Sequence, residues 1–341
     1  MTQYAIKGES APNLPWEARP AGTRGVLWRY SGNPVIGRNP TEHCARVFNS
    51  ALVPYEDGYM GVFRADHTSG GMRIHLARSK DAVNWEIDDD VIHWTDESGK
   101  PYQPFYGYDP RLVKIEDTYY IMWCTSFGYQ PTIGLGMTRD FKTFTRLENA
   151  YLPFNRNGVL FPRKINGNFV MLSRPSDNGH TPFGDIFLSE SPDLTYWGRH
   201  RKVMRVNGSS SWQSLKIGAG PIPIETSEGW LMIYHGVCNT CNGYVYSFGA
   251  ALLDLEQPSV VKYRTRPYLL TPEADYETVG FVQNVAFPCA ALTDTADGRI
   301  AIYYGAADTY VAIALGYVDE IIDFIKNNSQ LADGDGDIGR D

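Results

Sequence analysis

The chain has 341 residues, of which 43% are hydrophobic and 21% are charged, and this composition excludes disorder for the bulk of the chain. Its 39 acidic and 31 basic residues give a net charge of −8, and no segment is rich in Lys and Arg. Nucleic acid and anionic membrane surfaces are therefore poor partners. No run of about 18 apolar residues occurs, so no membrane span is expected.

Residues 1–33 are interpreted as an N-terminal extension, and the first 20 lack the apolar segment of a secretory signal. The five cysteines are odd in number and widely spaced, which fits a reducing cytoplasm better than a disulfide framework. Cys238 and Cys241 form a CxxC pair, but a single pair without nearby histidines is weak evidence for zinc. We therefore expect a cytoplasmic protein without a metal site.

A turn followed by an aromatic or apolar strand recurs along the chain. The strand begins near Tyr59, Tyr119, Phe169, Trp230 and Ile300. A second marker, an aspartate that ends a later strand, recurs in phase at Asp81, Asp140, Asp193, Asp254 and Asp319. Two independent markers that both count five units predict an all-β fold, a five-bladed β-propeller.

The predicted propeller is a single catalytic domain over residues 1–328. Its last segment, Val318–Asn328, has the apolar spacing of a short amphipathic helix. From Ser329 to Asp341 the chain is small, polar and acidic, which predicts a flexible tail.

Inner strands of a propeller meet around a central channel, so equivalent positions of different blades converge in space. Asn49 and Asp109 hold matching positions in the first two predicted inner strands. Matching positions of the second strands are taken by Arg64, Cys124, Arg174 and His235. Two arginines and a histidine on one axis are unusual for a packed core, so we expect a polar site at one mouth of the channel.

Asp109 precedes a proline in the segment Tyr108–Arg111, and the proline holds Asp109 in an extended conformation. A carboxyl group fixed at the channel mouth beside Tyr108 can act as a general acid. An aspartate in such a place can equally accept hydrogen bonds from backbone amides in a turn, and the spacing leaves both interpretations open.

A second group of candidates is basic, and its members lie at the edges of apolar strands: Arg156, Arg174, Lys216 and His235. Each alone is typical of a surface or salt-bridged residue. Together, in a chain of net charge −8, they indicate a site for an oxyanion such as phosphate.

Four segments carry a resemblance to a known family: residues 155–164 (NRNGVLFPRK), 173–180 (SRPSDNGH), 216–221 (KIGAGP) and 305–308 (GAAD). Through them the chain resembles glycoside hydrolase family 130 over about residues 33–329, most of all its members that act on 4-O-β-D-mannosyl-D-glucose. The resemblance implies a five-bladed propeller, in agreement with the repeat count. It also implies a homo-oligomer that converts this disaccharide and inorganic phosphate, with inversion and without a cofactor, to α-D-mannose 1-phosphate and D-glucose.

The resemblance also implies residue roles. Asp109 matches the catalytic acid, which is expected to act through the 3-hydroxyl of the mannosyl unit. Phosphate binding falls to Arg156, Arg174, Lys216, His235 and Tyr246. Binding of the mannosyl unit falls to Asn49, Ser50, Arg64 and Asp308. Residues near the acceptor sugar are Tyr108, Arg73 and His180.

Several alternatives stay open. Related enzymes act on β-1,4-mannooligosaccharides or on mannosyl-N-acetylglucosamine, and one sequence does not orient the acceptor loops. A β-mannoside hydrolase on the same fold needs a second carboxylate to activate water, whereas a phosphorylase needs one acid and a cationic pocket. The basic residues favour the phosphorylase. They also argue against a carbohydrate-binding propeller without activity, which has no use for an acid beside an anion pocket.

Overall fold

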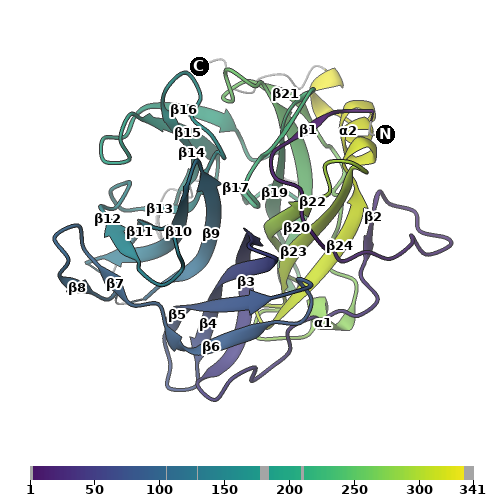
Figure 1. The fold of residues 1–341 in the computed structure, drawn as a ribbon. Coiled ribbons are helices and arrows are strands. Elements are labelled where there is room, and N and C mark those ends of the chain that lie inside the picture. Colours follow the sequence, from purple (N-terminus) through teal and green to yellow (C-terminus); the bar gives the residue numbers. More distant parts are fainter. Residues whose placement is uncertain (1–2, 105, 129, 177–183, 209–210, 334–341) are drawn as a thin grey trace.

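The computed structural model describes residues 3–104, 106–128, 130–176, 184–208 and 211–333. The strands form five sheets arranged around a central axis, and this arrangement confirms the predicted five-bladed β-propeller (Figure 1). Each sheet is one blade of mainly antiparallel strands.

The first three blades follow one another along the chain. Blade 1 contains β3 (Cys44–Tyr55), β4 (Gly58–His67), β5 (Met72–Ser79) and β6 (Glu86–Val91). Blade 2 contains β9 (Tyr108–Ile115), β10 (Thr118–Phe127), β11 (Gln130–Thr138) and β12 (Thr145–Leu147), with β7 (Trp94–Thr95) and β8 (Pro101–Tyr102) at its outer edge. Blade 3 contains β13 (Asn155–Leu160), β14 (Phe169–Pro175), β15 (Ile186–Ser191) and β16 (Gly198–Met204).

The last two blades each recruit one strand from the N-terminal region. Blade 4 contains β17 (Lys216–Ala219), β18 (Ile224–Thr226), β19 (Gly229–Thr240), β20 (Gly243–Leu253) and β21 (Val261–Arg264), and β1 (Ile6–Lys7) pairs with β18. Blade 5 contains β22 (Ala286–Thr293), β23 (Arg299–Ala306) and β24 (Tyr310–Tyr317), with β2 (Leu27–Arg29) as its outermost strand. The helices are α1 (Asp275–Thr278), α2 (Val318–Asn327) and the 3-10 turn η1 (Gln330–Asp333).

The sequence markers have a simple structural meaning. Tyr59 and its four counterparts lie at the start of the second strand of each blade. In blades 1 to 4 the marker aspartate follows the third strand and accepts backbone N–H bonds from the next residues, as Asp81 does from Val83 and Asn84. This Asx turn reverses the chain toward the outer strand. The fifth marker, Asp319, instead lies in α2 and accepts the backbone N–H groups of Gln3 and Tyr4.

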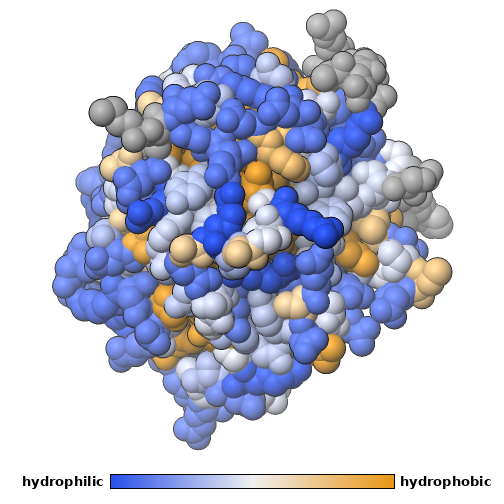
Figure 2. All heavy atoms as spheres, turned by 90° about the vertical axis from the view of Figure 1, so that its right-hand side faces the viewer, coloured by the Kyte–Doolittle hydropathy of each residue, from blue (hydrophilic) through white to orange (hydrophobic). Residues whose placement is uncertain are grey.

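Five clusters of buried apolar side chains fill the five spaces between neighbouring blades. The α2 helix, predicted at this place, adds Ile321, Ile322 and Ile325 to the cluster between blades 4 and 5. Burial of these clusters is the main driving force that holds the blades together. The outer surface beside β2 and α2 is mostly hydrophilic, with scattered hydrophobic spots (Figure 2).

The first residues of the segment expected as a flexible tail are packed against the propeller. The hydroxyl of Ser329 accepts a hydrogen bond from the backbone N–H of Arg264, and Gln330 is buried against Asn207 and Gln213. Ser329 and Gln330 can be buried because Arg264 of blade 4 and Asn207 and Gln213 of the loop before it form hydrogen bonds with them. Residues 334–341 lie outside the described part of the chain.

The N-terminal segment crosses the end of the channel where the inner strands finish. The Glu9 carboxylate pairs with Lys114 of blade 2 at 3.3 Å. The backbone N–H of Ala11 donates to Thr293 of blade 5, and that of Asn13 donates to the Tyr59 hydroxyl of blade 1. A small hollow of about 160 Å³, lined by Glu9 and inner-strand residues, lies beneath it. We therefore expect a ligand to enter from the opposite end, where the inner strands begin.

Candidate active site

The inner strands of blades 1, 2 and 3 contain a β-bulge at the same level. The pairing register shifts at Asn49–Ser50, at Asp109–Pro110 and at Asn157–Gly158. The first residue of each bulge has a positive φ, 48° for Asn49, 51° for Asp109 and 55° for Asn157. The extended conformation expected for Asp109 before its proline is therefore wrong, because the bulge sets the backbone at this position. Asn and Asp tolerate this conformation better than other side chains, and a bulge re-aims the side chain it carries. Local backbone geometry thus explains why Asn or Asp stands at all three positions.

Asp109 contacts side chains and not turn amides. Its Oδ1 accepts hydrogen bonds from Asn49 Nδ2 at 2.7 Å and from Arg64 Nη1 at 2.9 Å. Within the described residues, no group donates to Oδ2. The alternative of a simple turn cap is therefore wrong, and one carboxylate oxygen stays available to a ligand.

Arg64 is held in place by a buried network. Its Nε lies 3.3 Å from Asp66, which also pairs with Arg46 at 3.1 Å. The guanidinium stacks over the Phe48 ring at 4.1 Å. Because Arg64 is fixed on both sides, it can orient Asp109 without large motion.

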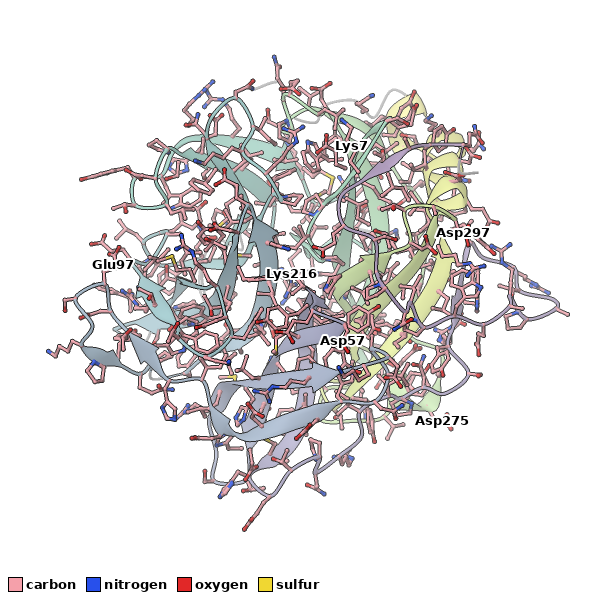
Figure 3. All side chains as sticks on the ribbon, viewed as in Figure 1. Lys7, Asp57, Glu97, Lys216, Asp275 and Asp297 are labelled. Atoms are coloured by element: carbon pink, nitrogen blue, oxygen red, sulfur yellow. The ribbon has the colours of Figure 1, made fainter. Side chains whose placement is uncertain are left out.

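The predicted basic residues do converge, although they come from blades 3 and 4. Arg174 Nη1 lies 2.9 Å from His235 Nε2, and Arg156 Nε donates to the Tyr108 hydroxyl at 3.3 Å. The Lys216 ammonium lies 5.3 Å from the centre of the Tyr246 ring. Figure 3 shows Lys216 near the centre of the ring of blades.

Two cationic groups of this basic cluster are withdrawn from solvent: Arg174 is buried and Lys216 is half-buried. Among the described residues, neither Arg174 nor Lys216 forms an ion pair with a carboxylate. Burial is the main cause that lowers the pKa of both groups, and for Lys216, with help from Arg174 and Arg156, the pKa falls to about 8. Unpaired buried cations are costly, so the arrangement is suited to a bound anion that offsets this cost.

His235 is neutral in this environment. Complete burial, with Arg174 and two further cations, lowers its pKa well below the usual value. Because the Arg174 guanidinium can only donate, His235 Nε2 accepts and the ring proton lies on Nδ1. That Nδ1 is buried and has no partner among the described residues. The neutral ring therefore leaves one buried N–H without an acceptor among these residues.

The lowered pKa of Lys216 predicts that activity falls at alkaline pH. The ammonium form, which attracts an anion, dominates below pH 8 and is lost above it. In the wild type, kcat/KM for phosphate should fall about tenfold per pH unit above this point, since this parameter reports the free enzyme. In Lys216→Arg the fall should move to higher pH, because guanidinium stays charged. An unchanged alkaline limb in Lys216→Arg would contradict the assignment.

Asp308 lies in the turn between β23 and β24 with φ of 45°. Burial raises the pKa of its carboxyl to about 6, against the opposing effect of Arg64. It is a second carboxylate close enough to affect Arg64 and Lys216 electrostatically.

Asp308→Asn should stabilise the protein, by about 3 kcal/mol at pH 8, because the raised native pKa means that ionisation opposes folding. The gain should shrink as the pH falls through 6 toward 4, where the native carboxyl is already protonated. Urea unfolding of the wild type and Asp308→Asn at pH 8 and pH 4 measures the difference in their free energies of unfolding. An equal gain at both pH values would show that the ionisation of Asp308 is not its source.

The other predicted residues have varied surroundings. Ser50 is buried and, among the described residues, its hydroxyl has no hydrogen-bond partner. The Tyr108 ring stacks on Tyr106, with 5.7 Å between ring centres. Arg73 lies near the start of β5 and donates to the Met72 carbonyl. His180 lies outside the described residues.

Sequence reasoning missed Asn157, the third member of the bulge series. Its Nδ2 lies 3.4 Å from His235 Nε2, so it belongs to the basic cluster. A signal was present, since Asn157 precedes a glycine in the same segment as Arg156. Phe287, whose ring centre lies 4.4 Å from that of His235, was missed as well.

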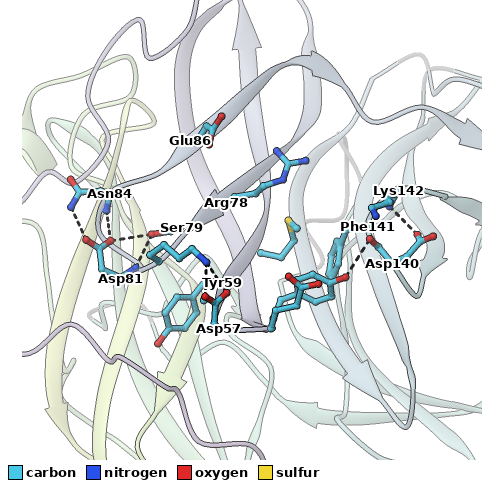
Figure 4. A pocket seen from close by; sticks show the side chains of 15 residues that line it. Asp57, Tyr59, Arg78, Ser79, Asp81, Asn84, Glu86, Asp140, Phe141 and Lys142 are labelled. Carbon is cyan, nitrogen blue, oxygen red and sulfur yellow. Dashed lines mark hydrogen bonds and ion pairs between the residues drawn. The ribbon is translucent and has the colours of Figure 1, made fainter.

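A larger hollow, about 570 Å³, lies elsewhere (Figure 4). It is lined by residues of blades 1 and 2, among them Tyr59, Arg78 and Phe141. None of the predicted site residues lines it, so hollow size alone does not locate the chemistry.

Comparison with known proteins decides the family. The family model described as β-1,4-mannooligosaccharide phosphorylase, of glycoside hydrolase family 130, matches residues 7–327. The chain belongs to glycoside hydrolase family 130. Membership confirms the resemblance described above and makes the chain an enzyme of the β-mannoside phosphorylase type.

Individual family 130 relatives differ in their linkage and acceptor. A β-1,4-mannooligosaccharide phosphorylase of Ruminococcus albus is 54% identical, covering 97% of this chain and 100% of the relative. A 4-O-β-D-mannosyl-D-glucose phosphorylase of Bacteroides fragilis is 26% identical, covering 89% and 82%. The solved β-1,2-mannobiose phosphorylase from Listeria innocua, in complex with β-1,2-mannobiose, has a TM-score of 0.79 at 27% identity, covering 88% of this chain and 99% of that one. In the described part of this family 130 chain, no helix has the length and apolarity to cross a membrane.

Proposed function

We propose that the protein catalyses inverting phosphorolysis of β-1,4-mannooligosaccharides, releasing α-D-mannose 1-phosphate. The observation that carries this proposal is the cluster of buried Arg174, half-buried Lys216 and neutral His235. It contains positive charge and unpaired donors, and the described residues supply no carboxylate partner to Arg174 or Lys216. Phosphate supplies the missing anion and is itself the nucleophile.

In this mechanism Asp109 supplies the proton for the leaving sugar oxygen. Asn49 and Arg64 hold Oδ1, so Oδ2 faces the substrate, and the proton passes through the 3-hydroxyl of the mannosyl unit. Attack of hydrogen phosphate on the anomeric carbon breaks the β-glycosidic bond on the opposite face and forms the α-phosphate ester. The proton of the phosphate then returns to Asp109, which balances the reaction.

Mannooligosaccharides are proposed in preference to mannosylglucose because of the identities with relatives. The 54% identical relative is named for β-1,4-mannooligosaccharides, whereas the relative named for mannosylglucose is 26% identical. The ratio of kcat/KM for β-1,4-mannobiose and for 4-O-β-D-mannosyl-D-glucose measures the preference. A ratio that favours mannosylglucose would restore the substrate expected from the sequence.

Hydrolysis is the second candidate, and Asp308 is the observation that favours it. An inverting hydrolase needs two carboxylates, about 6.5–9.5 Å apart, and Asp308 lies in the electrostatic neighbourhood of Asp109. Buried cations without partners favour phosphorolysis more strongly, because a water nucleophile gives them nothing to bind.

Product analysis with β-1,4-mannobiose, with and without inorganic phosphate, separates the two reactions. We expect α-mannose 1-phosphate and mannose only when phosphate is present. Release of two equivalents of mannose in phosphate-free buffer would identify a hydrolase and overturn the role given to the basic cluster.

A further inference from the structure

Blade 1 brings together three metal-ligating side chains outside the proposed active site. Cys44 begins β3, His67 ends β4 opposite it in register, and His75 lies on β5. One ligand atom from each lies within 4.8 Å of the others. His67 Nε2 is 2.7 Å from His75 Nε2, and Cys44 Sγ is 3.9 Å from the same nitrogen.

The hydrogen bond of His75 to a backbone carbonyl leaves its other ring nitrogen able to bind a metal ion. Its Nδ1 lies 2.8 Å from the Asp88 carbonyl oxygen, which can only accept, so the proton is on Nδ1 and the lone pair is on Nε2. That lone pair points to His67 and Cys44. A backbone carbonyl that orients a histidine in this way is the common outer partner of a metal-bound imidazole.

Burial and nearby charge suit a cation. Cys44 and His75 are completely buried, while His67 is partly exposed and offers an entry path. The adjacent strand β6 adds the negative charges of Asp89 and Asp90, whereas the charge of Asp88 is paired with Arg78.

We propose that Cys44, His67 and His75 bind a divalent transition-metal ion of the zinc class. Two imidazoles and a thiolate are a donor set that suits Zn²⁺, with solvent as the fourth ligand on the His67 side. Binding replaces the thiol proton of Cys44, and His67 moves its ring proton from Nε2 to Nδ1. About one proton is therefore released per ion bound.

The site lies away from the proposed chemistry but is linked to it through β4. His67 follows Asp66, whose carboxylate pairs with Arg64 and Arg46 on the other face of the strand. An ion that joins β3, β4 and β5 would brace the strand that carries Arg64. The proposed role is structural, and sequence analysis missed it because the ligands come from three different strands.

Cobalt binding to the reduced, untagged full chain tests this proposal, because a thiolate ligand gives Co²⁺ a characteristic charge-transfer absorption. We expect one equivalent of Co²⁺ to produce this band and Zn²⁺ to remove it by displacement. Cys44→Ser should lose the band, and His67→Gln, at a partly exposed position, should weaken binding by at least tenfold. Zn²⁺ should also raise the Tm of the wild type and leave the Tm of Cys44→Ser unchanged.

Cys238→Ser is the matched control, because the CxxC pair is the other place where a thiolate could hold the ion. The band should persist in Cys238→Ser. Loss of the band in that variant with retention in Cys44→Ser would overturn the proposal, and so would the absence of any band in folded wild-type protein. A circular dichroism spectrum of each variant shows that the propeller is intact.

Discussion

Asp109→Asn should lower kcat for phosphorolysis of β-1,4-mannobiose by about 10²–10⁴-fold, the usual contribution of a general acid. Asparagine has the same shape, tolerates the φ of 51°, and keeps an oxygen for Asn49 and Arg64. The variant therefore removes the proton and preserves the fold. Release of mannose 1-phosphate in a coupled assay measures the loss.

A substrate whose leaving group needs no proton provides the control for Asp109→Asn. With an aryl β-mannoside that carries an acidic phenol, the same variant should lose much less activity than with mannobiose. An equal loss with both substrates would mean that Asp109 positions the sugar and does not donate the proton. A near-normal rate with mannobiose would reject both roles.

Arg174→Gln should raise the KM for phosphate by about 10–100-fold, which corresponds to the loss of one or two charge-assisted hydrogen bonds. Arg174 is buried, holds the tautomer of His235 and, within the described residues, has no carboxylate partner, so its charge is free for an anion. The KM for mannobiose should change little. Initial rates with each substrate varied in turn separate the two effects.

Thermal shifts give a second readout for Arg174. Phosphate should raise the Tm of the wild type because it binds only the native state, and the rise should nearly vanish in Arg174→Gln. Arg201→Gln, at an exposed position of β16, is the matched control and should respond like the wild type. A phosphate-induced rise that survives in Arg174→Gln would place the anion elsewhere.

The number of repeats could be predicted because most blades share two local features, an apolar start of the second strand and an aspartate turn after the third strand. In each blade an aromatic or apolar residue is the first or second residue of the second strand, and in four blades an aspartate accepts backbone N–H groups after the third strand. Both are short-range requirements that leave a signal in the sequence. The matching of Asn49 with Asp109, and of Arg64 with Arg174, followed from this phase and agrees with the pairing register, in which each pair lies at a bulge. His235 pairs with Gly218 in blade 4, where the described strands β17 and β19 pair without a bulge.

Other features depend on contacts that sequence spacing does not encode. Sequence spacing matched only Asn49 and Asp109 among the inner strands, and the third bulge, at Asn157–Gly158, appears only in the pairing of β13 with β14. Ser329 appeared as the start of a polar tail, yet it is buried since Arg264 supplies a partner from the distant strand β21. The hydrogen bonds to Asp109 Oδ1 and to His235 Nε2, which leave Asp109 Oδ2 and His235 Nδ1 without partners among the described residues, also join residues that are distant in the sequence.

The strand β2 gives the folding of this protein a long-range closing step. Leu27–Arg29 leaves the ribosome before the other strands of blade 5, and its partner is β24, with Leu27 opposite Gly316. Until β24 has been made, Leu27–Arg29 has no neighbouring strand in blade 5, and unpaired strand edges invite pairing with other chains. We therefore expect a chain that is cut before Tyr310 to leave blade 5 open and to be more prone to aggregation than the longer chain.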